Sequence, residues 1–307
     1  MYPFKFKSIY KELVWGGNQL QLLFNRNLPS DKVGESWDIC THKNGTSVVA
    51  NGNLAGKTLQ ELLEIYPAQI VGTKASKSGR FPLLIKWIDA NDKLSIQVHP
   101  ADDYAYRVEG EPGKTEAWYI MTAKDNARIV YGLAENMSRE RFTAAIDAGN
   151  VGDTLRYVPV KTGDMIFVPA GLVHALLEGV VVCEVQQNSD TTYRVYDYDR
   201  IDTAGKSREL HINKALDVID FKTQPSTDFS KRKIECKYFS MEEIELNGRQ
   251  QERTAGQFIA YCVISGRGGI SYRELREELY LGDSVLVPAC LEEIVLEGDG
   301  LRLLKIR

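Results

Sequence analysis

The sequence predicts a mainly β protein, built from two β-sandwich or barrel units with a few helices. Short runs rich in Val, Ile, Tyr and Phe recur along the whole chain, and Gly, Pro, Asp and Asn separate them. This pattern is typical of short strands joined by turns. Helical patterns are few and do not alternate regularly with the strand runs, so a doubly wound parallel sheet is disfavoured.

Three segments carry helix signals. Residues 58–61 (TLQE) form a capping-box pattern that begins a helix, and this helix should end before Pro67. A second helix is expected from Ser138 to Ala148, because Gly149 follows it as a C-cap would. A third is expected near residues 210–219. The clearest strand signals lie at residues 94–98, 165–168, 180–186, 258–264, 284–287 and 301–306.

One pattern occurs twice in the chain. Residues 163–171 (GDMIFVPAG) and 282–290 (GDSVLVPAC) each indicate a Gly-Asp turn, a short apolar strand and a turn that begins with Pro. A polar, turn-rich stretch near residues 224–233 lies between the two copies. We therefore expect a larger domain at 1–225 and a smaller β domain at 226–307. The smaller one should lack a metal site, because no histidine follows residue 211.

The composition restricts the possible partners and the location. The 307 residues include 38 Lys and Arg against 42 Asp and Glu, so no basic field attracts nucleic acid. The five cysteines form no CxxC pair, which disfavours a disulfide framework and fits a reducing cytoplasm. No apolar stretch reaches the length of a signal peptide core or a membrane span. We expect a cytoplasmic protein with no membrane partner.

Residues 95–99 (SIQVH), which end directly before Pro100, contain alternating polar and apolar side chains. If residues 95–99 (SIQVH) form a strand, Ile96 and Val98 face a core, while Ser95, Gln97 and His99 share the opposite face. Such a strip either lines a pocket or lies on a solvated edge strand. The alternation by itself leaves both interpretations open.

A second histidine supports the pocket interpretation. The spacing G-x5-P-x-G-x2-H over residues 163–174 is similar to the second signature of the cupin family, in which this histidine ligates a metal inside a small β-barrel. The first signature is partly present: Gln97 stands where the first histidine of His-x-His is usual, His99 follows, and the expected glutamate is displaced to Glu116. The last position of the second signature is Glu178 rather than Asn.

These departures, together with further motifs, resemble one branch of that family, the type I mannose-6-phosphate isomerases. The resemblance extends over essentially the whole chain and is closest to the short bacterial form, which lacks a large helical insert. It implies cupin-like β-barrel or jelly-roll domains. The motifs that carry it are WGG at 15–17, GESW at 34–37, KW at 86–87, LSIQVHP at 94–100, GKTE at 113–116, YRVYDY at 193–198 and RELH at 208–211.

The resemblance implies one zinc ion per chain, with Gln97, His99, Glu116 and His174 at the ligand positions. Imidazole nitrogen and carboxylate oxygen are common zinc ligands, and catalytic sites keep a coordination position for water or substrate. The implied reaction interconverts mannose 6-phosphate and fructose 6-phosphate through a cis-enediol. Arg194 corresponds to the active-site arginine, which can stabilise the negative charge that develops on the carbonyl oxygen.

The reaction also needs a base and a site for the phosphate. Glu184 matches a family active-site carboxylate and is the first candidate for the base, although a salt-bridged strand carboxylate is an equally good interpretation of it. Lys86, Ser95 and Lys114 are the family-matched candidates for the phosphate. A small sugar phosphate is thus the expected partner of a monomer or weak homo-oligomer.

Two alternatives belong to other functional classes. A non-catalytic cupin that binds sugar phosphates would keep the phosphate-binding cations but would not need Glu184 and Arg194 together. An oxygen-using iron or manganese cupin is disfavoured by Gln97, which replaces a usual histidine ligand. A coupled isomerase assay would separate the first alternative from the isomerase.

Overall fold

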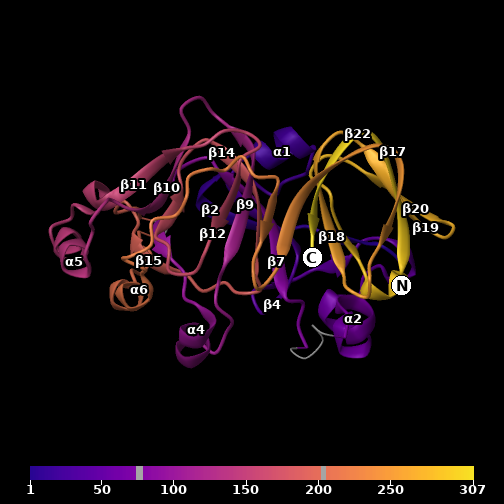
Figure 1. Cartoon of the computed structure of the whole chain (residues 1–307), viewed down its shortest axis with the longest axis horizontal. Helices are drawn as coiled ribbons and strands as arrows, with labels where there is room; N and C mark the ends of the chain where they lie inside the picture. Colours follow the sequence, from indigo (N-terminus) through magenta and orange to yellow (C-terminus); the bar gives the residue numbers. More distant parts are fainter. Residues whose placement is uncertain (74–78, 202–204) are drawn as a thin grey trace.

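A computed structural model describes residues 1–73, 79–201 and 205–307, and these are mainly β-strand with short helices, as the sequence predicts. The C-terminal strands gather at one end of the molecule, and strands of the first part form the other end (Figure 1). Within the described ranges, no helix combines the length and the apolar character that crossing a membrane requires.

Two antiparallel sheets form the part that carries the candidate site. The six-stranded sheet has the order β12-β9-β14-β7-β3-β2, and the five-stranded sheet has the order β11-β10-β13-β8-β15. The six strands are β2 (Ile9–Gly17), β3 (Val33–Ile39), β7 (Leu83–Ala90), β9 (Glu116–Ala123), β12 (Met165–Val168) and β14 (Val180–Gln187). The five are β8 (Ile96–Val98), β10 (Arg128–Leu133), β11 (Leu155–Pro159), β13 (His174–Leu176) and β15 (Tyr193–Tyr196).

The central strands of the six-stranded sheet are buried on both faces. Their even-numbered residues, such as Trp118 and Val182, pack with Ile129 of the five-stranded sheet in one core. Their odd-numbered residues, such as Trp87 and Cys183, pack in a second core that includes the C-terminal strands. Because side chains alternate along a strand, each of these strands contributes to two cores.

The third sheet combines the C-terminal strands with the N-terminal strand. Seven of its nine strands follow the path β16-β17-β22-β18-β21-β1-β6, while β19 pairs with β22 and β20 pairs with β19. The residue pair Phe4 and Leu286 shows that the start of the chain lies beside β21. The strands are β1 (Phe4–Lys7), β6 (Val48–Val49), β16 (Lys233–Glu235), β17 (Ser240–Arg253), β18 (Ile259–Ser265), β19 (Gly268–Tyr272), β20 (Leu275–Leu279), β21 (Ser284–Val287) and β22 (Glu293–Ile306). The strand β1 therefore crosses the expected domain division at 225/226, which stays a prediction.

The helices are short and follow the local signals. The capping box at Thr58 is formed, and its helix ends before Pro67, where a further short helix that the sequence did not predict begins. The side chain of Ser138 caps the helix that follows it. The helices are α1 (Gln19–Phe24), α2 (Leu59–Ile65), α3 (Pro67–Val71), α4 (Asp102–Val108), α5 (Arg139–Asp147) and α6 (Ile212–Val218), with 3-10 turns at Gly52–Leu54, Val151–Thr154 and Ala289–Leu291 and a small hairpin of β4 (Thr41–His42) and β5 (Gly45–Thr46).

The expected closed barrels are not confirmed. Among the described residues the six-stranded sheet ends at β12 and β2, the five-stranded sheet ends at β11 and β15, and no sheet closes on itself. The two sheets form an open sandwich instead. Both copies of the repeated pattern form a four-residue strand, β12 and β21, as expected.

Candidate active site

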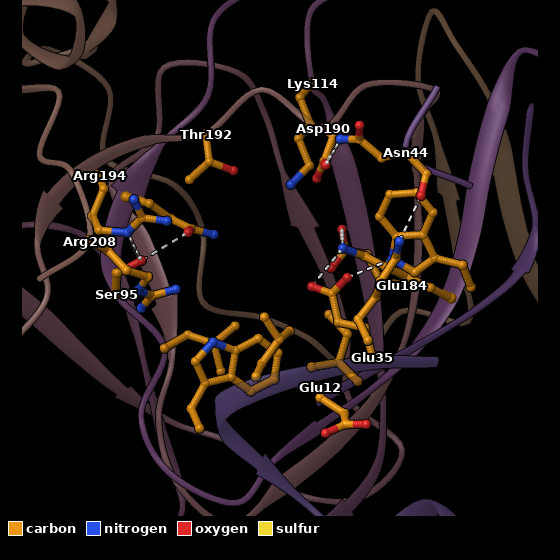
Figure 2. Close-up of a pocket in the computed structure, with 18 of the residues that line it drawn as sticks. Glu12, Glu35, Asn44, Ser95, Lys114, Glu184, Asp190, Thr192, Arg194 and Arg208 are labelled. Atoms are coloured by element: carbon orange, nitrogen blue, oxygen red, sulfur yellow. Dashed lines mark hydrogen bonds and ion pairs between the residues drawn. The ribbon is translucent and has the colours of Figure 1, made fainter. Parts of the chain in front are cut away.

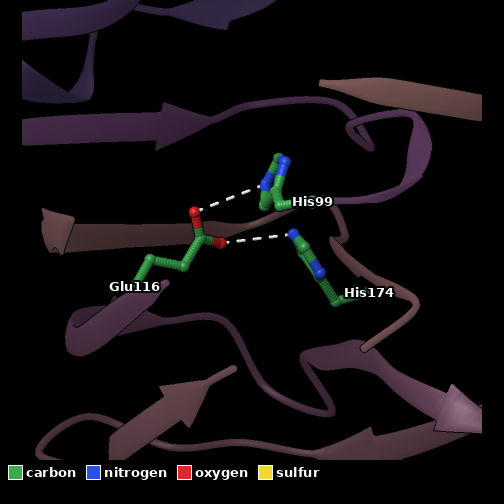
Figure 3. Close-up of side chains that lie close together, drawn as sticks. All are labelled: His99, Glu116 and His174. Carbon is green, nitrogen blue, oxygen red and sulfur yellow. Dashed lines mark ion pairs between the residues drawn. The ribbon is translucent and has the colours of Figure 1, made fainter. Parts of the chain in front are cut away.

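Three buried side chains inside the sandwich form a cluster that could hold a metal ion. His99 follows β8, Glu116 begins β9 and His174 begins β13, and each side chain is 1% exposed. The Nε2 atom of His99 lies 3.4 Å from Oε2 of Glu116, and Nε2 of His174 lies 3.2 Å from Oε1. Figure 3 shows both rings directed toward the one carboxylate.

The surroundings of the cluster suit a metal ion. The Nδ1 atoms of His99 and His174 lie 3.0 and 2.8 Å from the backbone oxygens of Thr191 and Leu172, which orients both rings with Nε2 toward the carboxylate. The Oε2 atom of Glu116 is buried and accepts no hydrogen bond in the described structure, although the amine of Lys114 lies 3.3 Å away. A buried carboxylate oxygen without a hydrogen bond is costly, and a metal ion would satisfy it.

Gln97 completes the cluster from the neighbouring strand. It pairs with His174 across β8 and β13, and its Nε2 atom lies 3.4 Å from Nε2 of that histidine. The nitrogen and oxygen of a side-chain amide exchange places when the amide rotates by half a turn. The rotated amide would present Oε1, a neutral ligand atom, to the cluster.

The ionisation of the cluster also favours a divalent cation. Burial, together with the positive charge of Lys114, lowers the pKa of His99 to about 3, so its imidazole is neutral at pH 7. Burial opposes ionisation of Glu116, but Lys114 and the imidazoles outweigh it and hold the pKa of this carboxyl well below its usual range. Imidazole nitrogen and carboxylate oxygen are ligand atoms that zinc accepts.

A polar cavity of about 650 Å³ lies next to the cluster. Gln97 and Lys114 line it, and the Nζ atom of Lys114 also lies 3.3 Å from Oε2 of Glu116. These two side chains therefore connect the cavity to the cluster. Figure 2 shows Ser95, Arg194 and Arg208 on one side of the cavity and Glu184 with Glu35 on the other.

The first side of the cavity carries an excess of positive charge. The Nε atom of Arg194 donates to the Ser95 hydroxyl at 3.3 Å, and Arg208 donates twice to the carboxylate of Asp197. Arg200 donates to the same carboxylate, so two guanidinium groups share one acid. Burial, together with nearby Arg208, lowers the pKa of Arg194. An anion at this side would relieve the repulsion between the guanidinium groups.

The opposite side contains a buried carboxylate and an amine. The Nζ atom of Lys86 lies 3.6 Å from Oε1 of Glu184 and 3.2 Å from Oε1 of Glu35. Burial and the charge of Glu116 raise the pKa of Glu184 to about 8, although Lys86 opposes this shift. Burial alone would lower the pKa of Lys86, but the carboxylates of Glu184 and Glu35 raise it. A glutamate that titrates near neutral pH is suited to accept and return a proton.

The structure thus groups the residues that the sequence singled out. The four expected metal ligands meet, Arg194 lies beside Ser95, Lys86 lies beside Glu184, and Lys114 lies at the cluster. Sequence reasoning did not assign roles to two further cavity residues, Arg208 and Glu35. Arg208 belongs to the motif RELH and Glu35 to the motif GESW, and these motifs were the only sequence signals for the two residues.

A β-sandwich whose interior holds two histidines and a glutamate belongs to the cupin class with a candidate metal centre. Family comparison agrees: residues 3–128 match the catalytic domain of type I phosphomannose isomerase, and residues 230–305 match the cupin domain of mannose-6-phosphate isomerase. The chain belongs to the type I mannose-6-phosphate isomerase family.

Individual relatives cover nearly the whole chain. The chain is 42% identical over 307 residues to mannose-6-phosphate isomerase ManA of Bacillus subtilis, with 96% of each protein covered. It is 38% identical over 306 residues to a mannose-6-phosphate isomerase of Streptococcus mutans, covering 97% of this chain and 96% of that one. The crystal structure of a mannose 6-phosphate isomerase from Bacillus subtilis matches with a TM-score of 0.92 at 38% identity, over 100% of both chains.

Proposed function

We propose that this chain is a zinc-dependent aldose-ketose isomerase that interconverts mannose 6-phosphate and fructose 6-phosphate. One observation carries the proposal. The buried cluster of His99, Glu116 and His174 borders a polar cavity with guanidinium groups on one side and a proton-accepting carboxylate on the other. The names of the relatives in Bacillus subtilis and Streptococcus mutans support the choice of substrate.

Gln97, His99, Glu116 and His174 would hold one zinc ion. When bound, zinc would act as a Lewis acid that polarises the oxygen atoms of the reacting carbons. Three of the four ligands are neutral, so the loaded site would keep a net positive charge. The buried oxygen of Glu116 that accepts no hydrogen bond supports this assignment.

The substrate phosphate is proposed to bind between Ser95 and Arg208, where guanidinium groups outnumber carboxylates. Lys114, at the boundary between the cavity and the cluster, would bind substrate oxygens near the reacting carbons. Lys86 would act through its ion pair with Glu184, since two carboxylates already neutralise its charge. This arrangement places the phosphate and the proton-transfer group on opposite sides of the cavity.

Glu184 is proposed to carry the proton between the two reacting carbons. As a carboxylate it accepts the proton from C2 of the aldose, which leaves a cis-enediolate with its negative charge on O1. The O2 hydroxyl passes its proton to O1, and Glu184 returns its own proton to C1 to give the ketose. Arg194 would stabilise the negative charge that develops on the substrate oxygen during this transfer. The reverse reaction follows the same steps in the opposite order.

A coupled assay that converts mannose 6-phosphate tests the proposal directly. We expect turnover, about one zinc ion per chain by elemental analysis, and loss of activity on chelation that added zinc restores. Full activity in protein stripped of metal would exclude the zinc-dependent mechanism. Sugar-phosphate binding without turnover in the zinc-loaded protein would favour a non-catalytic cupin.

Replacing the active-site arginine separates catalysis from metal binding. Arg194→Ala should lower kcat about 100-fold or more, because a preorganised cation at the developing charge is lost, while the zinc content stays unchanged. Arg141→Ala is the matched control, since this exposed guanidinium donates to the backbone oxygen of Asn136 and does not line the cavity. Equal turnover in the two variants would remove Arg194 from the mechanism.

A further inference from the structure

One carboxylate outside the cavity joins two parts of the molecule. Asp102, the first residue of α4, accepts hydrogen bonds at Oδ1 from the backbone nitrogen of Gly113 at 3.0 Å and from Nε2 of Gln187 at 2.9 Å. Its Oδ2 atom accepts from the hydroxyl of Tyr238 at 2.8 Å and from the amine of Lys237 at 3.4 Å. One oxygen thus faces the segment that precedes Glu116, and the other faces the turn between β16 and β17.

This network fixes three consecutive backbone amides. Asp102 binds the amide of Gly113, the backbone oxygen of Pro100 accepts from the amide of Lys114 at 3.0 Å, and Oε1 of Gln187 accepts from the amide of Thr115 at 2.9 Å. Gly113 lies so close to α4 that a Cβ atom there would be 2.6 Å from the backbone nitrogen of Asp102. The Cα atom of Lys114 is therefore held from both sides.

The position of Lys114 matters because its amine lies at the cluster. The Nζ atom is 3.2 Å from Nε2 of His99 and 3.3 Å from Oε2 of Glu116. Contacts at these distances are lost when the backbone beneath them moves by about 1 Å, and displacements of that size reduce catalysis strongly. The other two lysines of the cavity wall have different partners: Lys11 donates to the backbone oxygen of Asn44, and Lys86 pairs with Glu35 and Glu184.

We propose that Asp102 is a positioning residue for Lys114, and that Tyr238 holds Asp102 in place from the C-terminal sheet. The proposal rests on the proposed function in one respect, namely that Lys114 binds substrate. Tyr238 is separated from Asp102 by 136 positions in the chain. The C-terminal sheet, which contributes no residue to the cluster of His99, Glu116 and His174, thereby contributes to the geometry of the site.

The test compares two tyrosines that each donate to an aspartate. Tyr238→Phe removes the bond to Asp102, whereas Tyr104→Phe removes a 3.0 Å bond from α4 to Asp217 that does not touch the segment 113–115. We expect Tyr238→Phe to lower kcat/KM about fivefold, mainly through KM, with unchanged zinc content, because a charge-assisted hydrogen bond is lost. Tyr104→Phe should leave kcat/KM within twofold of the wild type. Equal effects of the two substitutions would overturn the proposal.

A double-mutant cycle distinguishes positioning from general destabilisation. If Tyr238 acts through Lys114, then Tyr238→Phe should have no further effect on kcat/KM in a Lys114→Ala background. A full fivefold loss in that background would show that Tyr238 acts by another route, and would overturn the proposal while leaving the isomerase activity intact.

A measurement independent of activity follows the backbone itself. Hydrogen exchange of a peptide that contains residues 113–115 should be about tenfold faster in Tyr238→Phe than in Tyr104→Phe. Without the Tyr238 hydroxyl, Asp102 is held less firmly as the acceptor of the Gly113 amide. This result is expected whether or not the wild type turns over mannose 6-phosphate, so failure of the proposed function and failure of the positioning role are distinguishable. Unchanged exchange in both variants would overturn the positioning role.

Discussion

At the scale of single residues, burial determines the chemistry that Glu184 can perform. The side chain is almost inaccessible to solvent and lies on the same strand face as Gln186. Desolvation and the negative charge of Glu116 raise the pKa of Glu184, and the amines of Lys86 and Lys114 oppose this shift. A glutamate on a solvated strand would ionise near pH 4 and would be a weak base.

This shift predicts the pH dependence of the reaction. A raised pKa means that Glu184 loses its proton later than an ordinary glutamate, so kcat/KM should rise with pH as the carboxylate forms. The proposed zinc ion at Glu116 would cancel part of the negative charge that raises the pKa of Glu184, so the midpoint in zinc-loaded enzyme should lie between the ordinary 4.5 and about 8. Glu184→Gln should abolish this rise of kcat/KM with pH, the ascending limb of the pH profile, and should lower kcat about 1000-fold.

The control for this experiment is Glu178→Gln, which removes an exposed carboxylate from the turn before the same strand. Its pH profile should match that of the wild type. An ascending limb that persists in the residual activity of Glu184→Gln would assign the titration to another group.

At the scale of elements, local signals account for where helices begin. In α2 the Thr58 side chain accepts from the backbone nitrogen of Glu61, and the Glu61 carboxylate accepts from the backbone nitrogen of Thr58. The helix then buries Leu59, Leu62 and Leu63 against the core shared with the C-terminal sheet. Capping and packing support the same short element.

Thr58→Ala should therefore lower the free energy of unfolding by about 1 kcal/mol, because the backbone amide of Glu61 loses the hydroxyl that accepts its hydrogen bond. Kinetic constants should stay unchanged, since α2 contributes no residue to the cavity. Thr143→Ala is the matched control: its hydroxyl bonds the backbone oxygen of Arg139 within α5, and its loss should be near neutral. Urea unfolding of the three proteins measures the difference, and equal midpoints for both variants would contradict the capping role.

At the scale of the whole molecule, a buried carboxylate joins the six-stranded sheet to the C-terminal sheet. The Oδ2 atom of Asp38 accepts from Nη2 of Arg26 at 2.8 Å, from the indole of Trp87 at 3.0 Å and from the hydroxyl of Ser284 at 2.9 Å. Arg26 also donates to the backbone oxygen of Gly282. The ion pair thus connects β3, β7 and the strand β21 in one network.

Arg26→Met should destabilise the protein by about 3 kcal/mol, because the carboxylate of Asp38 stays buried without its cation. Arg276→Met is the comparison, since its pairs with Glu278 and Glu297 are about half exposed and such pairs contribute less than about 1 kcal/mol. Chemical unfolding followed by tryptophan fluorescence measures both. If Arg26→Met lowers the free energy of unfolding by less than 1 kcal/mol, the contact between the six-stranded sheet and the C-terminal sheet depends on apolar packing alone.

The parts of the site that were predictable from sequence are those with a local pattern. Alternation along residues 95–99 placed Ser95, Gln97 and His99 on one face, and the structure confirms that Ile96 and Val98 pack in a core on the other. The contact between Lys86 and Glu35 joins residues 51 positions apart, and no local pattern encodes it. The proximity of Arg208 to Ser95 likewise depends on how the chain returns beside β15.

By itself, the sequence determined the mainly β class, the helix starts and the residue types that can bind a metal, because propensity, capping and alternation act over a few residues. Only the tertiary structure decided that the sheets stay open, that β1 joins the C-terminal sheet and that Tyr238 reaches Asp102. These outcomes depend on which surfaces are buried against each other, and burial also raises the pKa of Glu184. The composition of the site is thus a property of the sequence, and its charge state is a property of the packed molecule.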